Sequence, residues 1–244
     1  MIGRSRASSR CFAGSARRGL DVVIAMAALI MVAPAMFFIA LAIISDSPGP
    51  VFFSQVRLGR DGRPFRLHKF RKFYHRLDGG GCDVTLRNDA RMTRVGRLLE
   101  RTKLDEVPQL WNVLVGEMSI VGPRPESLVF ADCFTGPFRS ILDHTPGLLG
   151  PNQVFFRNEW KYFPAERDPH EFYRTVLFPV KARNDLAYFP QRSLRSDIVW
   201  IFRGVSAVFG LSATGEHGVE GTVDEVWRRE DLAPRSDATA LEHR

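Results

Sequence analysis

An uncharged, mostly apolar run of 23 residues, residues 22–44, constrains this chain more than any other feature of its sequence. As a helix rising about 1.5 Å per residue, such a run is long enough to cross a hydrocarbon layer of about 30 Å. It is too long for the apolar part of a signal peptide, and it continues through Ala33-Pro34-Ala35, where a cleavage site would have to lie. We therefore predict a membrane-embedded helix over residues 20–46.

The flanks of this helix leave its topology open. Residues 1–19 hold five arginines and no acidic residue, and are predicted to form a basic, flexible arm. Residues 57–72 are also rich in Arg and Lys, so both ends of the helix favour the cytoplasmic side. Pro34 lies near the middle of the run, where proline removes a backbone hydrogen bond and bends a helix. A kinked transmembrane span and a re-entrant helix that breaks at Pro34 are both compatible with these residues.

The net charge points to an anionic partner without naming it. The 244-residue chain has a formal net charge of +7 and a pI near 9.8. Phospholipid head groups, nucleotide phosphates and nucleic acid all suit such a chain. The three cysteines are widely spaced and include no CxxC pair, so neither a disulfide framework nor a zinc site is indicated, and a reducing setting fits.

The rest of the pattern predicts one domain of mixed structure. Residues 47–211 are expected to form one domain on the cytoplasmic side, and residues 212–244 a polar, disordered tail. Runs at 51–57 and 64–70 flank a Gly-containing turn and predict a β-hairpin, while apolar spacing predicts helices over 91–101 and 197–209. The later helix can serve either the core or the membrane surface. The expected fold class is α+β and mainly helical, with membrane-surface amphipathic helices around a compact core.

Residues 103–125 contain the side chains best suited to ligand binding or catalysis. Asp105 and Glu106 precede an apolar run that ends at Gly116, a typical helix C-cap, so Asp105 is predicted to be the N-cap of that helix. The N-terminus of a helix keeps a carboxylate ionised and attracts phosphate oxygens. Arg124 lies between two prolines in a stiff turn, and its planar guanidinium can bind two phosphate oxygens at once.

Four segments of this region resemble the signature of the bacterial sugar transferases, the monotopic polyprenyl-phosphate phosphoglycosyl transferases that hold a single helix in the membrane. They are Leu104-Asp105-Glu106-Val107-Pro108-Gln109-Leu110, Asn112-Val113-Leu114, Gly116-Glu117-Met118-Ser119 and Val121-Gly122-Pro123-Arg124-Pro125. The resemblance covers roughly residues 17–210. It implies transfer of a sugar-1-phosphate from a UDP-sugar to a polyprenyl phosphate such as undecaprenyl phosphate, with release of UMP. Such a reaction starts surface polysaccharide or glycoconjugate synthesis at the cytoplasmic face of the bacterial inner membrane.

The resemblance also implies roles for individual residues. In that family the aspartate of the Asp-Glu pair attacks the sugar-side phosphorus and carries the phosphosugar until the lipid phosphate takes it, which implies Asp105 as the nucleophile. Mg²⁺ is the implied cofactor, held by Asp105 and Glu106, and Glu106 is also a candidate to accept the proton of the lipid phosphate. Lys69, Arg71 and Arg124 are expected to face substrate phosphates. Direct attack by the lipid phosphate, with both carboxylates serving only as metal ligands, stays open.

Other matched positions carry further expectations. Gln153 and Arg157 lie at the family's spacing and are implied as substrate contacts. The resemblance favours the re-entrant form of the membrane helix with its break at Pro34, where Ala33 takes the place of the usual serine. Residues 158–173 are where we expect specificity for the sugar to lie. The sequence names neither the sugar nor the prenyl chain, and it leaves a homo-oligomer open.

Two charged residues depart from the family's pattern. Glu100 stands where a basic residue is usual, and Lys103 stands where serine is usual. A cation is therefore missing five residues before Asp105, which would alter nucleotide binding unless Arg101 or Lys103 replaces its charge.

A different class of protein also explains part of the sequence. A membrane-anchored, non-catalytic module that binds anionic lipid or nucleic acid would account for the positive charge and for the apolar helix. It offers no reason for an acidic pair near a Pro-Arg-Pro turn. The sequence therefore favours the enzyme, for which no nucleic-acid partner is expected.

Overall fold

The computed structural model describes residues 3–75, 89–164 and 167–208 of the chain. Its helices and strands are α1 (Gly3–Asp46), β1 (Phe52–Leu58), β2 (Pro64–Phe70), α2 (Arg94–Thr102), α3 (Gln109–Val115), β3 (Ser119–Val121), β4 (Gly147–Leu149), α4 (Pro151–Phe155), α5 (Pro169–Phe172), α6 (Phe178–Tyr188) and α7 (Leu194–Val208). The described part is mainly helical with two small sheets, in agreement with the predicted class. The predicted tail, residues 212–244, lies outside the described residues.

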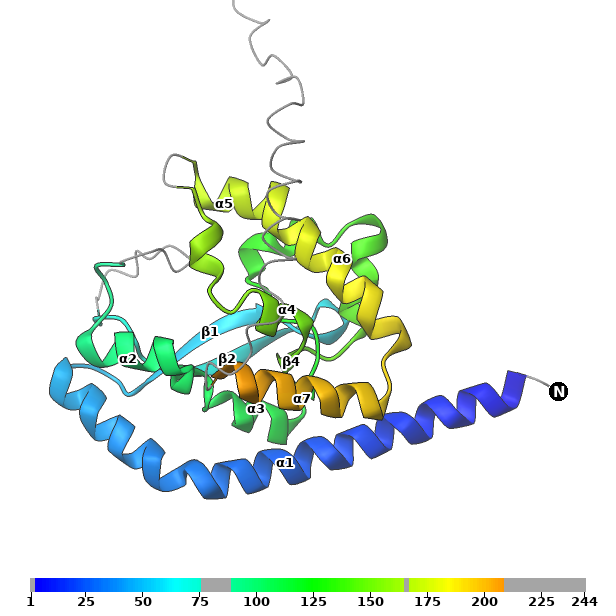
Figure 1. Cartoon of the computed structure of the whole chain (residues 1–244), viewed down its shortest axis with the longest axis horizontal. Helices are drawn as coiled ribbons and strands as arrows, with labels where there is room; N and C mark the ends of the chain where they lie inside the picture. Colours follow the sequence, from blue (N-terminus) through cyan, green and yellow to red (C-terminus); the bar gives the residue numbers. More distant parts are fainter. Residues whose placement is uncertain (1–2, 76–88, 165–166, 209–244) are drawn as a thin grey trace, which may run out of the picture.

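The N-terminal helix α1 runs along one edge of the molecule and bends in its second half (Figure 1). It passes through Pro34 without interruption, and a proline there explains a bend. Its stretch Gly14–Asp46 is long and apolar enough to cross a membrane, judged by length and composition. Ile30, Met31 and Phe38 point away from the protein, each more than 60% exposed. Whether this helix spans the membrane or returns to the same face stays a prediction.

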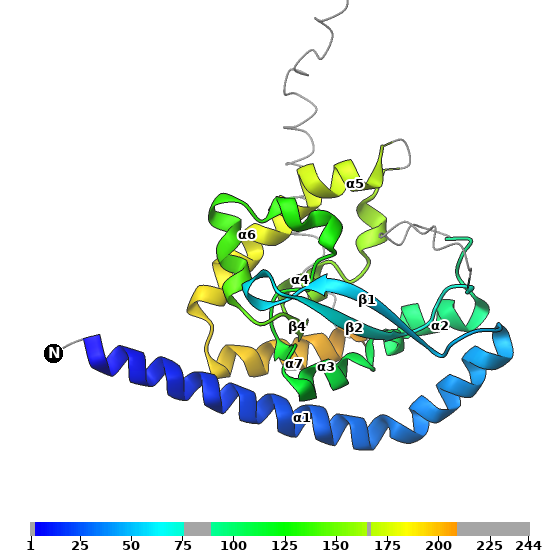
Figure 2. The same cartoon turned by 180° about the vertical axis from the view of Figure 1, so that it is seen from behind.

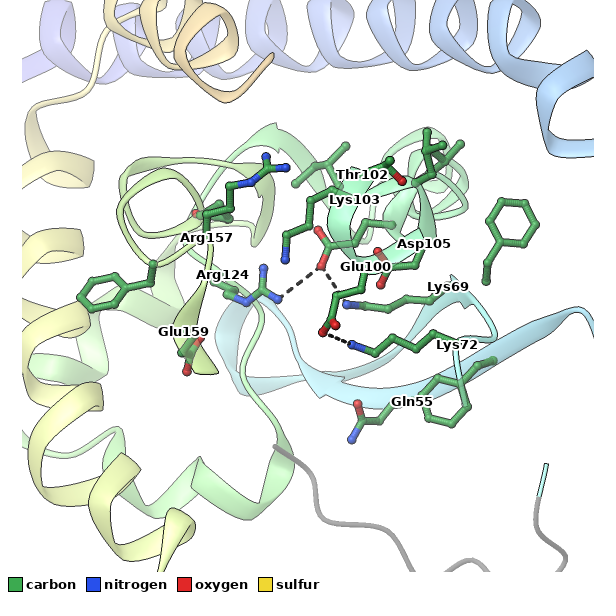
Figure 3. A pocket seen from close by; sticks show the side chains of 18 of the residues that line it. Gln55, Lys69, Lys72, Glu100, Thr102, Lys103, Asp105, Arg124, Arg157 and Glu159 are labelled. Atoms are coloured by element: carbon green, nitrogen blue, oxygen red, sulfur yellow. Dashed lines mark hydrogen bonds and ion pairs between the residues drawn. The ribbon is translucent and has the colours of Figure 1, made fainter. Parts of the chain in front are cut away.

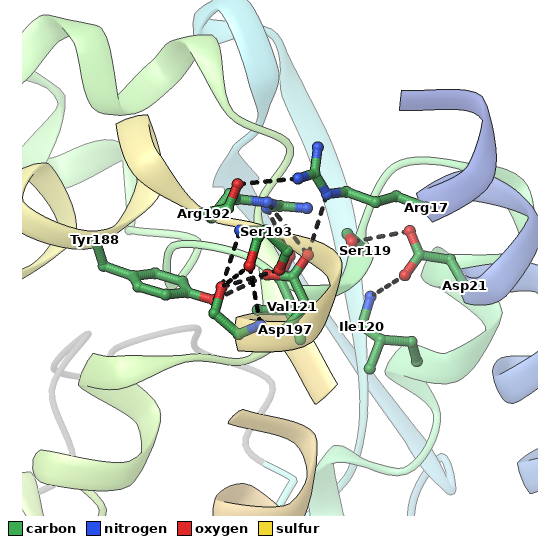
Figure 4. A network of polar contacts seen from close by, with 10 residues as sticks. Arg17, Asp21, Ser119, Ile120, Val121, Tyr188, Arg192, Ser193 and Asp197 are labelled. Carbon is green, nitrogen blue, oxygen red and sulfur yellow. Dashed lines mark hydrogen bonds and ion pairs between the residues drawn. The ribbon is translucent and has the colours of Figure 1, made fainter. Parts of the chain in front are cut away.

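Helix α1 already begins at Gly3, so the flexible arm predicted for residues 1–19 is helical from residue 3 onward. Ala and Arg both favour helix, and the second half of this segment is held by contacts with the domain. Arg17 pairs with Asp197 on α7 at 3.1 Å (Figure 4). Arg18 donates to the carbonyl of Leu114 at 2.6 Å. These contacts fix the start of the apolar run against α3 and α7.

The predicted β-hairpin is confirmed. Strands β1 and β2 pair antiparallel from Phe52 opposite Phe70 to Leu58 opposite Pro64. Asn112 of α3 joins the hairpin to the helix: its Oδ1 accepts from the backbone N–H of His68 and its Nδ2 donates to the carbonyl of Arg66. The end of β2 thereby lies beside the segment that carries the acidic pair.

The second sheet is a short parallel pair, β3 and β4. Its strands lead into a very close approach of two glycines, because a Cβ on Gly147 would lie only 1.9 Å from the nitrogen of Gly122. Glycine is needed at both positions for this packing. The turn that holds Arg124 starts immediately after Gly122, so the close contact fixes the backbone position from which the Arg124 side chain extends.

Two groups of helices enclose these sheets (Figures 1 and 2). Leu110 and Val113 of α3 pack with Met118, Ile120 and Phe189 in a core shared by α1, β2, β3 and α7. A second core gathers around α5 and α6 and the helical turn between them. The hairpin lies between these groups, and a cavity opens where they meet.

Helix α7 confirms the helix predicted over 197–209 and shows which side of it is buried. Trp200 is 8% exposed, whereas Ile198, Phe202 and Val205 are between 46% and 69% exposed. Most of its predicted apolar stripe thus faces away from the core. Helix α2 starts at Arg94, later than predicted, because Thr93 caps it by accepting from the N–H of Gly96.

Candidate active site

A cavity of about 730 Å³ lies between the end of β2, the turn before α3, the segment after β3 and helix α6. Its wall combines basic, acidic and aromatic side chains. Figure 3 shows Lys69, Lys103 and Arg124 converging on the region of Asp105. The cavity has the volume expected for a nucleotide-sized ligand.

Asp105 is buried, with 2% of its surface exposed, and it lines this cavity. Its Oδ1 has no hydrogen-bond partner among the described residues. Burial raises the pKa of this carboxyl above its ordinary value, and the nearby Lys69 opposes that rise. An unpartnered, desolvated carboxylate oxygen at a cavity wall is a group kept available for a ligand or a reaction.

The prediction that Asp105 caps α3 is wrong. Asp105 lies inside a separate 3-10 turn, Leu104–Glu106, and the residue preceding α3 is Pro108, which makes no side-chain cap. The turn closes through backbone bonds from Glu106 to Lys103 and from Val107 to Leu104. The N–H groups at the start of α3 therefore lie beyond the acidic pair. The predicted C-cap is confirmed, since Gly116 has φ 92° and its N–H bonds to α3 carbonyls.

Glu106 joins two elements that are distant in the sequence. Its Oε1 lies 2.9 Å from Nζ of Lys69 on β2 and 3.3 Å from Nη2 of Arg124. Burial alone would raise the pKa of Glu106, but the attraction of Lys69, Arg124 and Lys103 outweighs it and holds the pKa well below its usual range. Burial would likewise lower the pKa of Arg124, and the charge of Glu106 reverses this. Both groups stay charged.

Lys103 contributes a further cation to the same wall. Its backbone is left-handed, with φ 59°, and forms the C-cap of α2 immediately before the turn that holds Asp105. Figure 3 shows its side chain reaching toward Arg124. Three cations, Lys69, Lys103 and Arg124, thus surround two carboxylates, and the excess of positive charge suits a diphosphate.

The departure at Glu100 is matched by an ion pair. Its carboxylate lies 3.1 Å from Nζ of Lys72, which follows β2 (Figure 3). The acid is thereby neutralised by a residue of the cavity wall. Lys103 is placed to supply positive charge beside Asp105, as expected if it replaces the missing cation.

The other predicted site residues also line the cavity, but each makes a contact with the protein backbone. Arg71 donates to the carbonyls of Ser47, at 2.7 Å, and Pro48, and so holds the segment after α1. Gln153 donates from Nε2 to the carbonyls of Gly122 and Gly147. Arg157 donates to the carbonyl of Arg101 at 3.1 Å. Their contacts with substrate stay predictions. Pro34 lies on α1 and is not part of the lining.

Sequence reasoning missed a second polar group in the same cavity. Lys181 of α6 is 3% exposed, and its Nζ lies 3.0 Å from Glu126, 3.5 Å from Glu159 and 2.5 Å from the hydroxyl of Tyr173. The sequence held one usable signal, a lysine within the mostly apolar run 176–182. Buried lysines require a partner, so a lysine in such a run predicts an acidic side chain close to it.

The acidic pair can be tested for its fit to a metal ion. No three His, Cys, Asp or Glu side chains come together within residues 3–75, 89–164 and 167–208. Mg²⁺ does not require such a cage, since it is often bound by one or two carboxylates together with substrate phosphates and water. The unpartnered Oδ1 of Asp105 and the adjacent Glu106 fit that mode of binding.

Comparison with known proteins identifies relatives. A family model described as "Bacterial sugar transferase" matches residues 12–211. The chain is 34% identical over 197 residues to the UDP-N-acetylgalactosamine-undecaprenyl-phosphate N-acetylgalactosaminephosphotransferase of Aeromonas hydrophila, covering 79% of this chain and 43% of that protein. It is 36% identical over 189 residues to the UDP-glucose:undecaprenyl-phosphate glucose-1-phosphate transferase of Escherichia coli strain K12, covering 76% of this chain and 38% of that protein. The chain thus spans less than half the length of these two relatives.

Proposed function

Since this chain belongs to the bacterial sugar transferase family, we propose that it transfers a sugar-1-phosphate from a UDP-sugar to a membrane polyprenyl phosphate, giving a polyprenyl-diphosphate sugar and UMP. The observation that most strongly supports this proposal is the environment of the Asp105 carboxylate. Its buried Oδ1 is without a hydrogen-bond partner among the described residues and stands at a cavity wall lined by cations. Both relatives named above have undecaprenyl-phosphate in their names.

The reaction proceeds in two displacements at one phosphorus atom. An oxygen of Asp105 attacks the sugar-side phosphorus of the UDP-sugar, and the bond from that phosphorus to the bridging oxygen breaks. UMP leaves with the electron pair, and the sugar phosphate stays bonded to the carboxylate as an acyl phosphate. An oxygen of the polyprenyl phosphate then attacks the same phosphorus. Asp105 leaves as a carboxylate, and the diphosphate link to the lipid is complete.

The surrounding cations stabilise charge through both steps. Arg124 and Lys69 face the negative oxygens of the diphosphate, and Glu106 holds these two side chains in place through its ion pairs. The contacts of Glu106 with Lys69 and Arg124 support this positioning role. When bound by Asp105 and Glu106, Mg²⁺ would offset the negative charge that gathers on the phosphates.

The location of the cavity suits a reaction between a lipid and a soluble nucleotide. Helix α1 provides the membrane anchor, and exposed apolar residues of α3 and α7, such as Trp111 and Phe202, provide a surface for lipid near it. In this proposal α1 is re-entrant, with its bend at Pro34, and the domain lies on the cytoplasmic face. The polyprenyl phosphate then reaches Asp105 from the bilayer while the UDP-sugar enters from water.

The experiment is Asp105→Asn in the full chain, reconstituted with undecaprenyl phosphate and a panel of UDP-sugars. UMP release should fall to background, because an amide cannot form the acyl phosphate. The fold should persist, since the new side chain has the same shape and the carboxylate was desolvated. Asp143→Asn, at an exposed position, is the matched control and should retain full activity. Turnover of Asp105→Asn at a rate near that of the wild type would reject the covalent route.

A further inference from the structure

Beyond Arg124 the cavity continues into the buried polar cluster made by Glu126, Glu159, Tyr173 and Lys181. Figure 3 shows Glu159 on the opposite side of Arg124 from Lys69, away from the acidic pair. Arg124 is electrostatically coupled to Glu106 on one side and to Glu159 and Glu126 on the other. The cluster therefore adjoins the phosphate-binding wall and does not overlap with it.

In this cluster the carboxylate of Glu159 keeps unused capacity to accept hydrogen bonds. Glu126 and Tyr173 are buried, and both bond closely to Lys181, at 3.0 and 2.5 Å. Glu159 lies 3.5 Å from the same ammonium, at the outer limit of a hydrogen bond, and 22% of its side chain is exposed. Two carboxylates share one ammonium, and Arg124 balances part of their charge from one side, so Glu159 keeps free acceptor capacity where it meets the cavity.

The surroundings of Glu159 combine this acceptor with aromatic faces. Phe130, Phe156 and Tyr173 line the same cavity, so aromatic side chains surround this end of it. A sugar ring presents hydroxyl donors around its rim and C–H groups on its faces. Carboxylate oxygens match the first, and aromatic rings match the second.

Rigid elements hold this arrangement in place. Lys181 projects from α6, and its backbone carbonyl accepts from Nδ2 of Asn152, a residue of α4 that is 1% exposed. Glu159 begins the short 3-10 helix Glu159–Tyr162, within the segment where specificity for the sugar is expected. A ligand group that enters this end of the cavity thus meets a preorganised wall.

We propose that Glu159, positioned by Lys181, accepts hydrogen bonds from the hydroxyls of the transferred sugar and selects neutral hexoses against sugars that carry a carboxylate. This inference rests on the proposed function and deepens it, because it names the class of sugar. A uronic acid would bring a further negative charge toward the carboxylates of Glu159 and Glu126, which share the ammonium of Lys181. Repulsion between like charges in a poorly solvated pocket disfavours such a substrate.

Two substitutions of Glu159 separate the parts of this proposal. In Glu159→Ala the acceptor is lost, so kcat/KM for the best neutral UDP-hexose should fall about tenfold, the effect of one hydrogen bond to a charged group. In Glu159→Gln the charge is lost, so the ratio of kcat/KM for UDP-glucuronate to that for the neutral UDP-hexose should rise about tenfold. Glu171→Gln, exposed on α5 and outside the lining, is the control and should change neither quantity.

Binding of UDP, which lacks the sugar, provides a readout independent of turnover. The affinity of both Glu159 variants for UDP should equal that of the wild type, while the extra affinity for the UDP-hexose over UDP is lost in Glu159→Ala. Equal loss of affinity for UDP would place Glu159 at the nucleotide and overturn the proposal, as would an unchanged ratio in Glu159→Gln or a wild type that prefers UDP-glucuronate. Absence of UMP release from every UDP-sugar would instead reject the proposed function.

Discussion

A buried polar contact joins α1 to β3, and breaking it should destabilise the fold. Asp21 of α1 is 8% exposed, and its two carboxylate oxygens accept from Oγ of Ser119 at 2.8 Å and from the N–H of Ile120 at 2.9 Å (Figure 4). Ser119 and Ile120 lead directly to the segment that carries Arg124. Asp21 therefore links the membrane helix to the wall of the cavity.

Asp21→Ala removes both acceptors and leaves a buried hydroxyl and a buried N–H without partners. Each unsatisfied group costs roughly 1–3 kcal/mol, so the loss of unfolding free energy from the two groups should be about 2–6 kcal/mol. For a domain of this size each kcal/mol corresponds to about 2–4 °C, which gives a fall in Tm of at least about 4 °C. In Asp21→Asn an oxygen still accepts from Ile120 and the amide can donate to Ser119, so its Tm should fall much less.

The assay is thermal unfolding of the full chain in lipid nanodiscs, followed by circular dichroism and by tryptophan fluorescence. Asp143→Ala, an exposed site in the same chain, provides the control for substitution as such. A Tm for Asp21→Ala equal to that of the control would refute the reasoning, because it would mean that these two buried bonds contribute no net stability.

Three further predictions concern titration, the segment after α1, and the metal. Burial raises the pKa of Asp185 from 3.8 to about 8, so the folded state favours the protonated carboxyl. The resulting stabilisation is present in full below the pKa of 3.8 and is lost as the pH rises from there through about 8. Denaturant titrations should show unfolding free energy falling by at least about 1 kcal/mol across this window, with a flatter profile in Asp185→Asn. Arg71→Ala leaves the carbonyls of Ser47 and Pro48 without their donor, so it should lower Tm by several degrees while the affinity for UDP is retained. An unchanged Tm with a loss of UDP affinity would instead place Arg71 at the phosphate site. Chelation with EDTA should stop UMP release and added Mg²⁺ should restore it, whereas full activity in EDTA would remove the metal from the mechanism.

The elements that depend on local pattern were predictable. The length of the apolar run, the alternation and turn residues of the hairpin, and the glycine that ends α3 each determine structure within a few residues. The importance of residues 103–125 also followed from their composition, because an acidic pair and a restrained arginine are unusual in one segment. These features need no knowledge of the tertiary fold.

The site geometry was not predictable in the same way because it depends on contacts between distant residues. Glu106 meets Lys69 across 37 positions and Arg124 across 18, and Lys181 meets Glu159 across 22. Local pattern also failed at Asp105, where a separate 3-10 turn replaced the predicted cap. Local pattern predicted Arg71 at the cavity but did not reveal that the guanidinium of Arg71 donates hydrogen bonds to backbone carbonyls.

Mass spectrometry of protein quenched during turnover tests the central claim most directly. With a UDP-sugar present and polyprenyl phosphate withheld, we expect the peptide that contains Asp105 to carry the added mass of one sugar phosphate, which disappears when the lipid phosphate is supplied. The adduct should be absent in Asp105→Asn. Continuous release of UMP during transfer to lipid, with this peptide unmodified at every time point, would contradict the account.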